Sequence, residues 1–230
     1  MNHIKSFIIF AFAVLTFSGC ATAPIVPIDP TANINNLSCD ISLSIKNTNT
    51  NKGISGRGYL IMSLPDKFRM IILSPFGTTV AEMFMTGDKI LYIASTENKA
   101  YKGSIYDVES IPALQGWRLL RWTTERVYPE TPGQTELTRK RSDGVTETII
   151  FDSQGLILKK SANGEEVVYE GYQSVGGVPV PKAITIKDRY GVKTRIVIED
   201  PEVNKELDPA AFSPNLEGIT VMPLRDIPGL

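Results

Sequence analysis

The chain has 230 residues, with 24 lysines and arginines against 25 acidic residues and a formal charge of −1. This length fits one domain with a sizeable core, and the balanced charge favours neither a nucleic-acid surface nor an acidic tail. The only histidine is His3 and the only cysteines are Cys20 and Cys39, so the chain offers little for histidine-based catalysis or a metal centre.

Catalytic motifs are also missing from the sequence. It has no Walker-type glycine loop and no Gly-x-Ser-x-Gly elbow. Carboxylates are abundant, but a glycosidase pair depends on their placement in space. We therefore expect a binding protein that needs no cofactor and binds no nucleic acid. The alternative, a hydrolase, would require polar side chains clustered in a cavity.

Residues 1–19 have the pattern of a signal peptide that ends before a cysteine. Lys5 supplies the positive charge, an apolar run extends from Phe7 to Phe17, and Ser18-Gly19 precedes Cys20. The apolar run is too short for a normal membrane span. The pattern resembles a bacterial lipoprotein signal, which implies that Cys20 becomes the acylated first residue. An ordinary signal peptide or an N-terminal anchor is the alternative.

Cleavage before Cys20 would leave 211 residues, and because Lys5 is the one charged residue lost, the formal charge becomes −2. Cys39 would then be the only free thiol, and we expect it to be buried and structural. Ala21 follows the cysteine, which by resemblance to the usual sorting rule favours the outer membrane. Residues 20–30, with three prolines, are predicted to tether the domain to the anchor.

The first part of the domain is predicted to contain a short helix and then strands. Thr31 has the chemistry of an N-cap, which predicts a helix at the start of residues 31–40. Residues 41–45 alternate between apolar and polar, as half-buried strands do, and residues 47–53 form a polar hairpin loop.

Two strands and a tight turn follow, over residues 67–73, 74–77 and 80–85. Pro75 fixes its own φ and Gly77 permits positive φ, so the turn places the apolar side chain of Phe76 at its tip. Loop tips are normally polar. Phe76 therefore either folds back as a plug for its own hairpin or faces a partner or a membrane.

Residues 104–124 change to helical spacing, with a break at Pro112. Residues 128–134 are rich in Pro and Gly and form an exit loop. From Thr135 onward, turn signals separate short β-rich runs at regular spacing, which indicates an antiparallel sandwich or barrel.

Two blocks of the sequence resemble the LolB family of outer-membrane lipoproteins. The first contains Gly58-Tyr59, Asp-Lys-Phe-Arg-Met-Ile-Ile-Leu at 66–73, Ser-Pro-Phe-Gly-Thr-Thr at 74–79, Gly87-Asp88 and Asn-Lys-Ala-Tyr-Lys-Gly at 98–103. The second is Val-Val-Tyr-Glu-Gly-Tyr at 167–172, followed by Val-Pro-Val-Pro at 178–181. The resemblance implies a mainly β (α+β) fold: a strongly curved, unclosed antiparallel β-barrel with a short helical lid. The domain would span residues 31–215, and residues 216–230 would form a C-terminal tail or edge segment.

The resemblance also implies a function. Such a protein is a monomer, anchored through Cys20 to the periplasmic face of the outer membrane, that receives acylated lipoproteins from a periplasmic LolA-type carrier and helps to insert them into the inner leaflet. The apolar residue at the tip of the central turn acts in insertion, and here Phe76 stands where the family usually has Leu. A structural or sensor lipoprotein that transfers nothing remains the alternative.

The strand pattern adds a candidate cavity. Alternation places Met70 on the side away from Arg69, and Met83 and Met85 on the side away from Glu82. Methionine is flexible and polarizable, so a surface rich in it can repack around varied partners. This side is either the wall of an acyl-chain cavity or an ordinary core packed under a helix. The candidate cavity residues are Met70, Ile72, Met83, Met85, Trp117 and Leu120.

Overall fold

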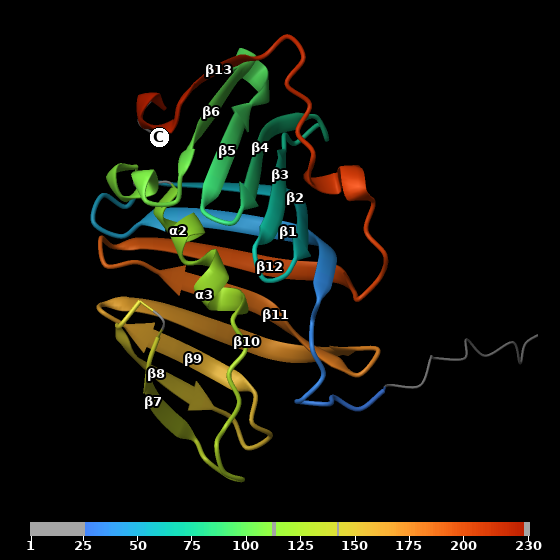
Figure 1. The fold of residues 1–230 in the computed structure, drawn as a ribbon, viewed down its shortest axis with the longest axis vertical. Helices are drawn as coiled ribbons and strands as arrows, with labels where there is room; N and C mark the ends of the chain where they lie inside the picture. The colour runs from blue at the N-terminus through green and yellow to red at the C-terminus, as the bar shows by residue number, and fades with distance from the viewer. Residues whose placement is uncertain (1–25, 112–113, 142, 228–230) are drawn as a thin grey trace, which may run out of the picture.

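The computed structural model describes residues 26–111, 114–141 and 143–227, which form one strongly curved sheet (Figure 1). Its 13 strands within the described ranges lie in the order β13-β6-β5-β4-β3-β2-β1-β12-β11-β10-β9-β8-β7. The sheet does not close, because β13 and β7 are its two edges. Neighbouring strands are antiparallel except β13, which runs parallel to β6. The predicted mainly β, unclosed half-barrel is therefore confirmed.

The strands are β1 (Asn36–Asn47), β2 (Gly53–Ser63), β3 (Lys67–Leu73), β4 (Thr79–Thr86), β5 (Lys89–Ala94), β6 (Lys99–Ser104), β7 (Glu136–Lys140), β8 (Thr146–Phe151), β9 (Ile157–Ala162), β10 (Glu165–Val175), β11 (Val178–Lys187), β12 (Val192–Val203) and β13 (Thr220–Pro223). The helices are α2 (Gln115–Arg118) and α3 (Leu120–Thr124), and the 3₁₀ turns are η2 (Ser95–Glu97), η3 (Asp107–Ser110), η5 (Pro209–Phe212) and η6 (Leu224–Asp226).

Consecutive hairpins build each half of the sheet, and the two halves join between β1 and β12. These strands pair from Leu37 opposite Val203 to Asn47 opposite Val192. The sheet therefore combines β1–β6 with β7–β12, although the segment that contains α2 and α3 separates the two sets along the chain. Side chains from both halves face one concave side.

The apolar face predicted from strand alternation is the core. Phe68 and Met70 are 0% and 2% exposed, and they stand opposite Met85 and Met83 on β4. Alternate residues point to the other face, where Arg69 forms an ion pair of 2.7 Å with Glu82 on β4. The alternation of side chains along a strand therefore places the charged residues of these central strands on one face of the sheet and the apolar residues on the other.

Helices α2 and α3 lie over the concave side of the sheet and confirm the predicted short helical lid (Figure 1). Trp117, Leu120 and Trp122 are buried in the main core. Leu119 separates the two helices, and its amide donates to the carbonyl of Gly116. No helix in the part of the chain that the structure describes is long and apolar enough to cross a membrane.

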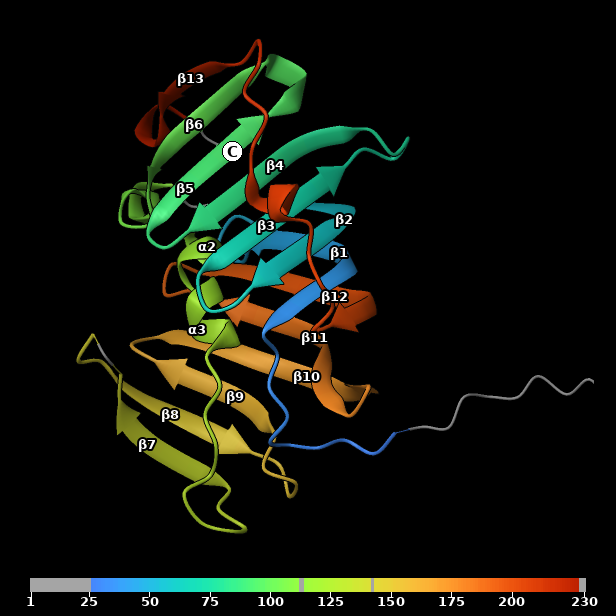
Figure 2. The ribbon, with the colours of Figure 1, turned by 45° about the vertical axis from the view of Figure 1, so that its right-hand side comes forward.

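The segment from residue 204 to 227, which we call the C-terminal strap, crosses the convex side of the first half of the sheet (Figure 2). Leu216 and Ile219 pack on a second small apolar cluster, formed by Phe84, Leu91, Ile93 and Ala100. The guanidinium of Arg69 donates to the carbonyl of Ala211 at 3.0 Å. The strap then adds β13 to the sheet edge and buries Leu224.

The predicted helix after Thr31 is wrong. Residues 31–35 are turn and coil, and β1 already begins at Asn36. Instead of capping a helix, Thr31 donates from its amide and hydroxyl to Asp29 at 2.8 and 2.7 Å. The amides of Asn35 and Asn36 donate to the side chain of Asn204, which aligns β1 for its pairing with β12. Long-range pairing therefore overrides the local capping signal.

Candidate functional site

The proposed acylation site, Cys20, lies outside the described residues. The chain that follows is in contact with the domain, because the amide of Asp29 donates to the carbonyl of Gly177 in the β10–β11 turn at 2.8 Å. The pKa of the Asp29 carboxyl is lowered, chiefly by the hydrogen bonds that it accepts from Thr31. The first described residues therefore leave the domain at the β10–β11 turn.

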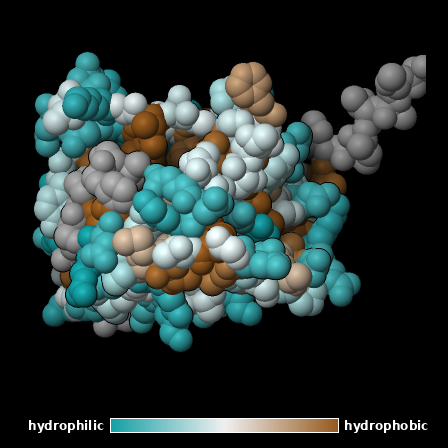
Figure 3. All heavy atoms as spheres, turned by 90° about the horizontal axis from the view of Figure 1, so that it is seen from above, coloured by the Kyte–Doolittle hydropathy of each residue, from teal (hydrophilic) through white to brown (hydrophobic). Residues whose placement is uncertain are grey.

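Phe76 is 93% exposed at the tip of the β3–β4 turn, which excludes a plug for its own hairpin. Hydrogen bonds fix the turn: the Ser74 amide donates to the Thr78 carbonyl at 2.8 Å, and the two hydroxyls lie 2.7 Å apart. Gly77 has a φ of 81°, which favours glycine. The turn projects beyond the sheet (Figure 2), and an isolated apolar side chain stands clear of the surface in Figure 3.

An apolar cavity of about 90 Å³ lies between the lid and the concave side of the sheet. Its walls come from both halves of the sheet and from α3. The lining residues on the sheet include Leu37, Leu60, Met62, Ile157, Tyr169, Tyr172, Val180, Ile184, Ile196 and Ile198. Leu120 and Thr123 supply the lid side.

The candidate cavity residues are divided between the cavity and the core. Leu120 lines the apolar cavity, and it also lines, with Met70 and Trp117, a void of about 20 Å³ next to it. Met83, Met85 and Ile72 lie outside both lining sets and pack with the main core.

Sequence reasoning missed most of the cavity wall, which β10, β11 and β12 supply. The alternation in 167–172 and 183–199 was visible in the sequence, but it did not show which half of the chain would lie opposite the lid. The strand order settles this point, because β12 joins β1 in the middle of the sheet.

The cavity is smaller than an acyl chain. Ligand pockets usually measure about 300–1,000 Å³, which is at least three times the 90 Å³ of this cavity. The lid covers the cavity, so it must move before a whole chain can enter. With the lid in this position, which we call closed, the cavity has no room for a whole acyl chain.

Buried polar groups hold the lid closed, and we call this set the lid anchor. Lys160 donates to the carbonyls of Trp122, at 2.7 Å, and Glu125, where α3 ends. The hydroxyl of Tyr169 donates to the carbonyl of Thr123 at 2.7 Å. These side chains satisfy carbonyls that a helix end leaves without partners. Burial lowers the pKa of Lys160 to about 8, against the opposing effect of nearby Glu125 and Glu147.

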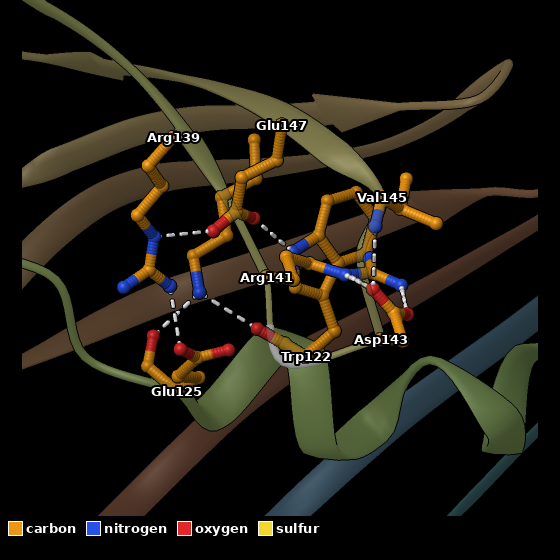
Figure 4. A network of polar contacts seen from close by, with 8 residues as sticks. Trp122, Glu125, Arg139, Arg141, Asp143, Val145 and Glu147 are labelled. Carbon is orange, nitrogen blue, oxygen red and sulfur yellow. Dashed lines mark hydrogen bonds and ion pairs between the residues drawn. The ribbon is translucent and has the colours of Figure 1, made fainter.

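Glu147 extends the lid anchor from β8 (Figure 4). It is fully buried and accepts a hydrogen bond of 2.5 Å from the indole of Trp122 and one of 2.6 Å from Arg139. Arg139 also pairs with Glu125, and these two carboxylates raise its pKa against the opposing effect of desolvation. The guanidinium of Arg141 stacks 5.0 Å from the Trp122 ring. The lid is therefore bonded to β8, β9 and β10 by charged and polar side chains.

A charged cleft of about 780 Å³ adjoins the apolar cavity. In the part of the chain that the structure describes, the two share five lining residues: Ile34, Leu64, Thr124, Glu125 and Arg126. The arginines that line the cleft within the described ranges are four, at positions 118, 121, 126 and 141. The closed site therefore consists of an apolar chamber next to an opening that carries charges.

A curved, unclosed sheet with a helical lid over an apolar cavity defines the class of protein to which this chain belongs, the half-barrel proteins of the LolA and LolB type. The model of the family described as "Outer membrane lipoprotein LolB" matches residues 35–200. The match covers most of the chain, so the protein belongs to the LolB family. The family is one of outer-membrane lipoproteins.

Solved structures agree on the fold. A DUF1329 family protein from Desulfovibrio piger is similar with a TM-score of 0.60 and 11% identity, over 79% of this chain and 90% of that one. A LolA superfamily protein from Nitrosomonas europaea gives a TM-score of 0.50 and 11% identity, over 80% and 93%. A putative outer membrane lipoprotein-sorting protein domain from Vibrio parahaemolyticus gives 0.50 and 12%, over 78% and 89%. The chain has no match among curated protein sequences.

Proposed function

We propose that this protein is a lipid-anchored acceptor of acylated polypeptides at the outer membrane. It binds their acyl chains under the lid and helps to insert them into the inner leaflet. It acts as a monomer without catalysis or cofactor, after acylation of Cys20 and delivery of cargo by a LolA-type periplasmic carrier. The observation that carries the proposal is the exposure of Phe76 on a turn fixed by hydrogen bonds.

The arrangement of the chain supports a common membrane-facing side. In Figure 2, the β3–β4 turn and the start of the described chain, in blue, both lie toward the right of the view. A membrane on this side would be within reach both of an acyl group at Cys20 and of Phe76. Full burial of a Phe side chain is worth ~1.5–3 kcal/mol, which corresponds to roughly one to two orders of magnitude in partitioning.

The cavity supports acyl binding, because removing apolar surface from water stabilises a complex by ~25 cal/mol per Å². Its small closed volume also favours a second candidate function, a structural or sensor lipoprotein of the same family that transfers nothing. Extraction of lipid from the purified protein, together with a transfer assay, separates these two functions.

The test is a comparison of Phe76→Glu with Phe76→Leu. Because the side chain is exposed, both variants should melt at the temperature of the wild type. Phe76→Glu should still take up an acylated peptide but deliver it to liposomes at least roughly ten-fold more slowly, since the charge cannot enter the bilayer. Phe76→Leu keeps an apolar tip and should deliver normally. A folded Phe76→Glu protein that delivers cargo at the normal rate would end the insertion hypothesis.

A further inference from the structure

The arginines of the charged cleft differ in their partners. Three are neutralised by ion pairs: Arg118 with Glu165, Arg121 with Asp88, and Arg141 with Asp143. Of the carboxylates that line the cleft, Glu125 is paired with Arg139. These pairs leave Arg126 as the one cleft arginine within the described ranges that makes no ion pair.

Arg126 bonds to neutral acceptors instead. One terminal nitrogen donates to the carbonyl of Ala32 and the other to the carbonyl of Pro179 at 3.5 Å. Neutral carbonyls do not cancel a positive charge. The pKa of the Asp29 carboxyl is lowered chiefly by the hydrogen bonds from Thr31 and least by Arg126, with which Asp29 forms no ion pair. The second contact is at the limit for a hydrogen bond, so this nitrogen is still able to donate to a stronger acceptor.

The position of Arg126 indicates which kind of ligand its charge could bind. Among the described residues, five line both the charged cleft and the apolar cavity, and Arg126 is the only cation of these five. A guanidinium at the boundary between an apolar chamber and a wet opening matches an amphiphile whose negative group is attached directly to its acyl chains. A planar guanidinium binds phosphate oxygens through two parallel hydrogen bonds.

We propose that the site also takes a glycerophospholipid, with an acyl chain in the apolar cavity and the phosphate on Arg126. The inference rests on the acyl-binding part of the proposed function. It adds a ligand class, because an acylated amino-terminal cysteine carries no negative charge next to its chains, whereas a phospholipid does. A LolB-type acceptor would thereby exchange a membrane phospholipid for its cargo within one cavity.

The experiment compares two soluble lipids with the same single chain: lysophosphatidylglycerol, which carries the phosphate, and the uncharged monoacylglycerol. Binding to the wild-type protein is measured by the fluorescence of its tryptophans, both of which lie in the lid. The phosphate lipid should bind more tightly, and its advantage should shrink as salt is raised. Free inorganic phosphate should not compete, because the acyl chain supplies the rest of the affinity.

Arg126→Gln should lower the affinity for the phosphate lipid by at least roughly ten-fold, while the affinity for the uncharged lipid should stay within about two-fold of the wild type. Arg126→Lys should restore part of the preference, because it restores the charge. Arg121→Gln is the matched control: this arginine lines the cleft but is paired with Asp88 and does not line the cavity. The Arg121→Gln variant should prefer the phosphate lipid over the uncharged lipid by the same factor as the wild type.

Equal binding of the two lipids by the wild type would overturn the inference and leave the acyl cavity standing. An Arg126→Gln variant that loses both lipids equally would also overturn it, because Arg126 would then act only by holding Ala32 and Pro179 in place. If neither lipid binds to the wild type, acyl binding itself fails, and both proposals fail with it.

Discussion

Lys160 makes the stability of the protein depend on pH in a way that the structure determines. Its ammonium is fully buried under the end of α3, and burial lowers its pKa from 10.5 to about 8. At 1.36 kcal/mol per pKa unit, keeping this side chain charged in the folded state costs about 3 kcal/mol. This is the net cost, because a pKa compares the charged and neutral forms with all of their contacts in place.

The sign follows from proton binding. Below pH 8, Lys160 is protonated in both the folded and unfolded chains, so the cost is present in full. Between pH 8 and 10.5, the folded protein releases the proton while the unfolded chain keeps it, and the free energy of unfolding rises with pH. Cys39 has the opposite effect on the free energy of unfolding, because burial raises the pKa of its thiol to about 12. Above the normal pKa of a thiol, the unfolded chain loses this proton while the folded protein keeps it, so the free energy of unfolding falls with pH.

A variant isolates the contribution of Lys160. Urea unfolding of the wild type and of Lys160→Met, followed by tryptophan fluorescence at several pH values, gives the difference between their free energies of unfolding. This difference should shift in favour of the wild type by about 3 kcal/mol between pH 8 and 10.5. Lys159→Met is the control, because this neighbour is partly exposed and pairs with Glu166 at the surface. Parallel pH profiles for the wild type and Lys160→Met would refute a charged, buried lysine.

Two further predictions concern the anchor and the sheet. Cys20→Ala should abolish acylation and leave the precursor uncleaved or cleaved elsewhere, which mass spectrometry of the N-terminus checks. For the wild type, a mature, unmodified N-terminus at a position other than 20 would exclude a lipoprotein. Gly58→Ala should lower the free energy of unfolding by about 3 kcal/mol or more, because a Cβ there would overlap the carbonyl of Ile71. Gly56→Ala is the control in the same denaturation experiment. Its Cβ would come no closer than 3.4 Å to another atom, the side chain of Ile72, so it should cost less than about 1 kcal/mol.

Local patterns in the sequence were sufficient to predict several features of the fold. Alternation around Met70 and Arg69 correctly separated the core side of β3 from its charged side. Pro75 and Gly77 predicted the tight turn, and the structure shows that Phe76 is exposed there. Each of these features depends on neighbours within a few residues, so one sequence is sufficient to find it.

Long-range features could not be read in this way. Lys160 and Glu147 look like surface residues of short amphipathic strands, yet both are fully buried beneath the lid. Their burial depends on α3, which lies more than twenty residues earlier in the chain. Arg126 follows α3 in an irregular segment, and its position at the cavity mouth depends on contacts with the segments of Ala32 and Pro179.

The lid anchor sets an energetic threshold for the acyl binding proposed above, because its bonds must break before a chain can enter. Opening the lid must break the hydrogen bonds of Tyr169 and Trp122, which are worth ~1 kcal/mol for the neutral bond of Tyr169 and ~1.5–3 kcal/mol for the bond of Trp122 to the Glu147 carboxylate. The bonds of Lys160 add nothing to this sum, because exposing its ammonium to water recovers the cost of burying it. Each buried CH₂ of an acyl chain returns ~0.8 kcal/mol. A chain of two or three methylenes therefore cannot offset the loss of these bonds, whereas a chain of more than about five can. A lid closed by apolar contacts alone would lack this threshold, because an entering chain would replace those contacts gradually, whereas buried ionic bonds leave unpaired groups when only one partner moves away.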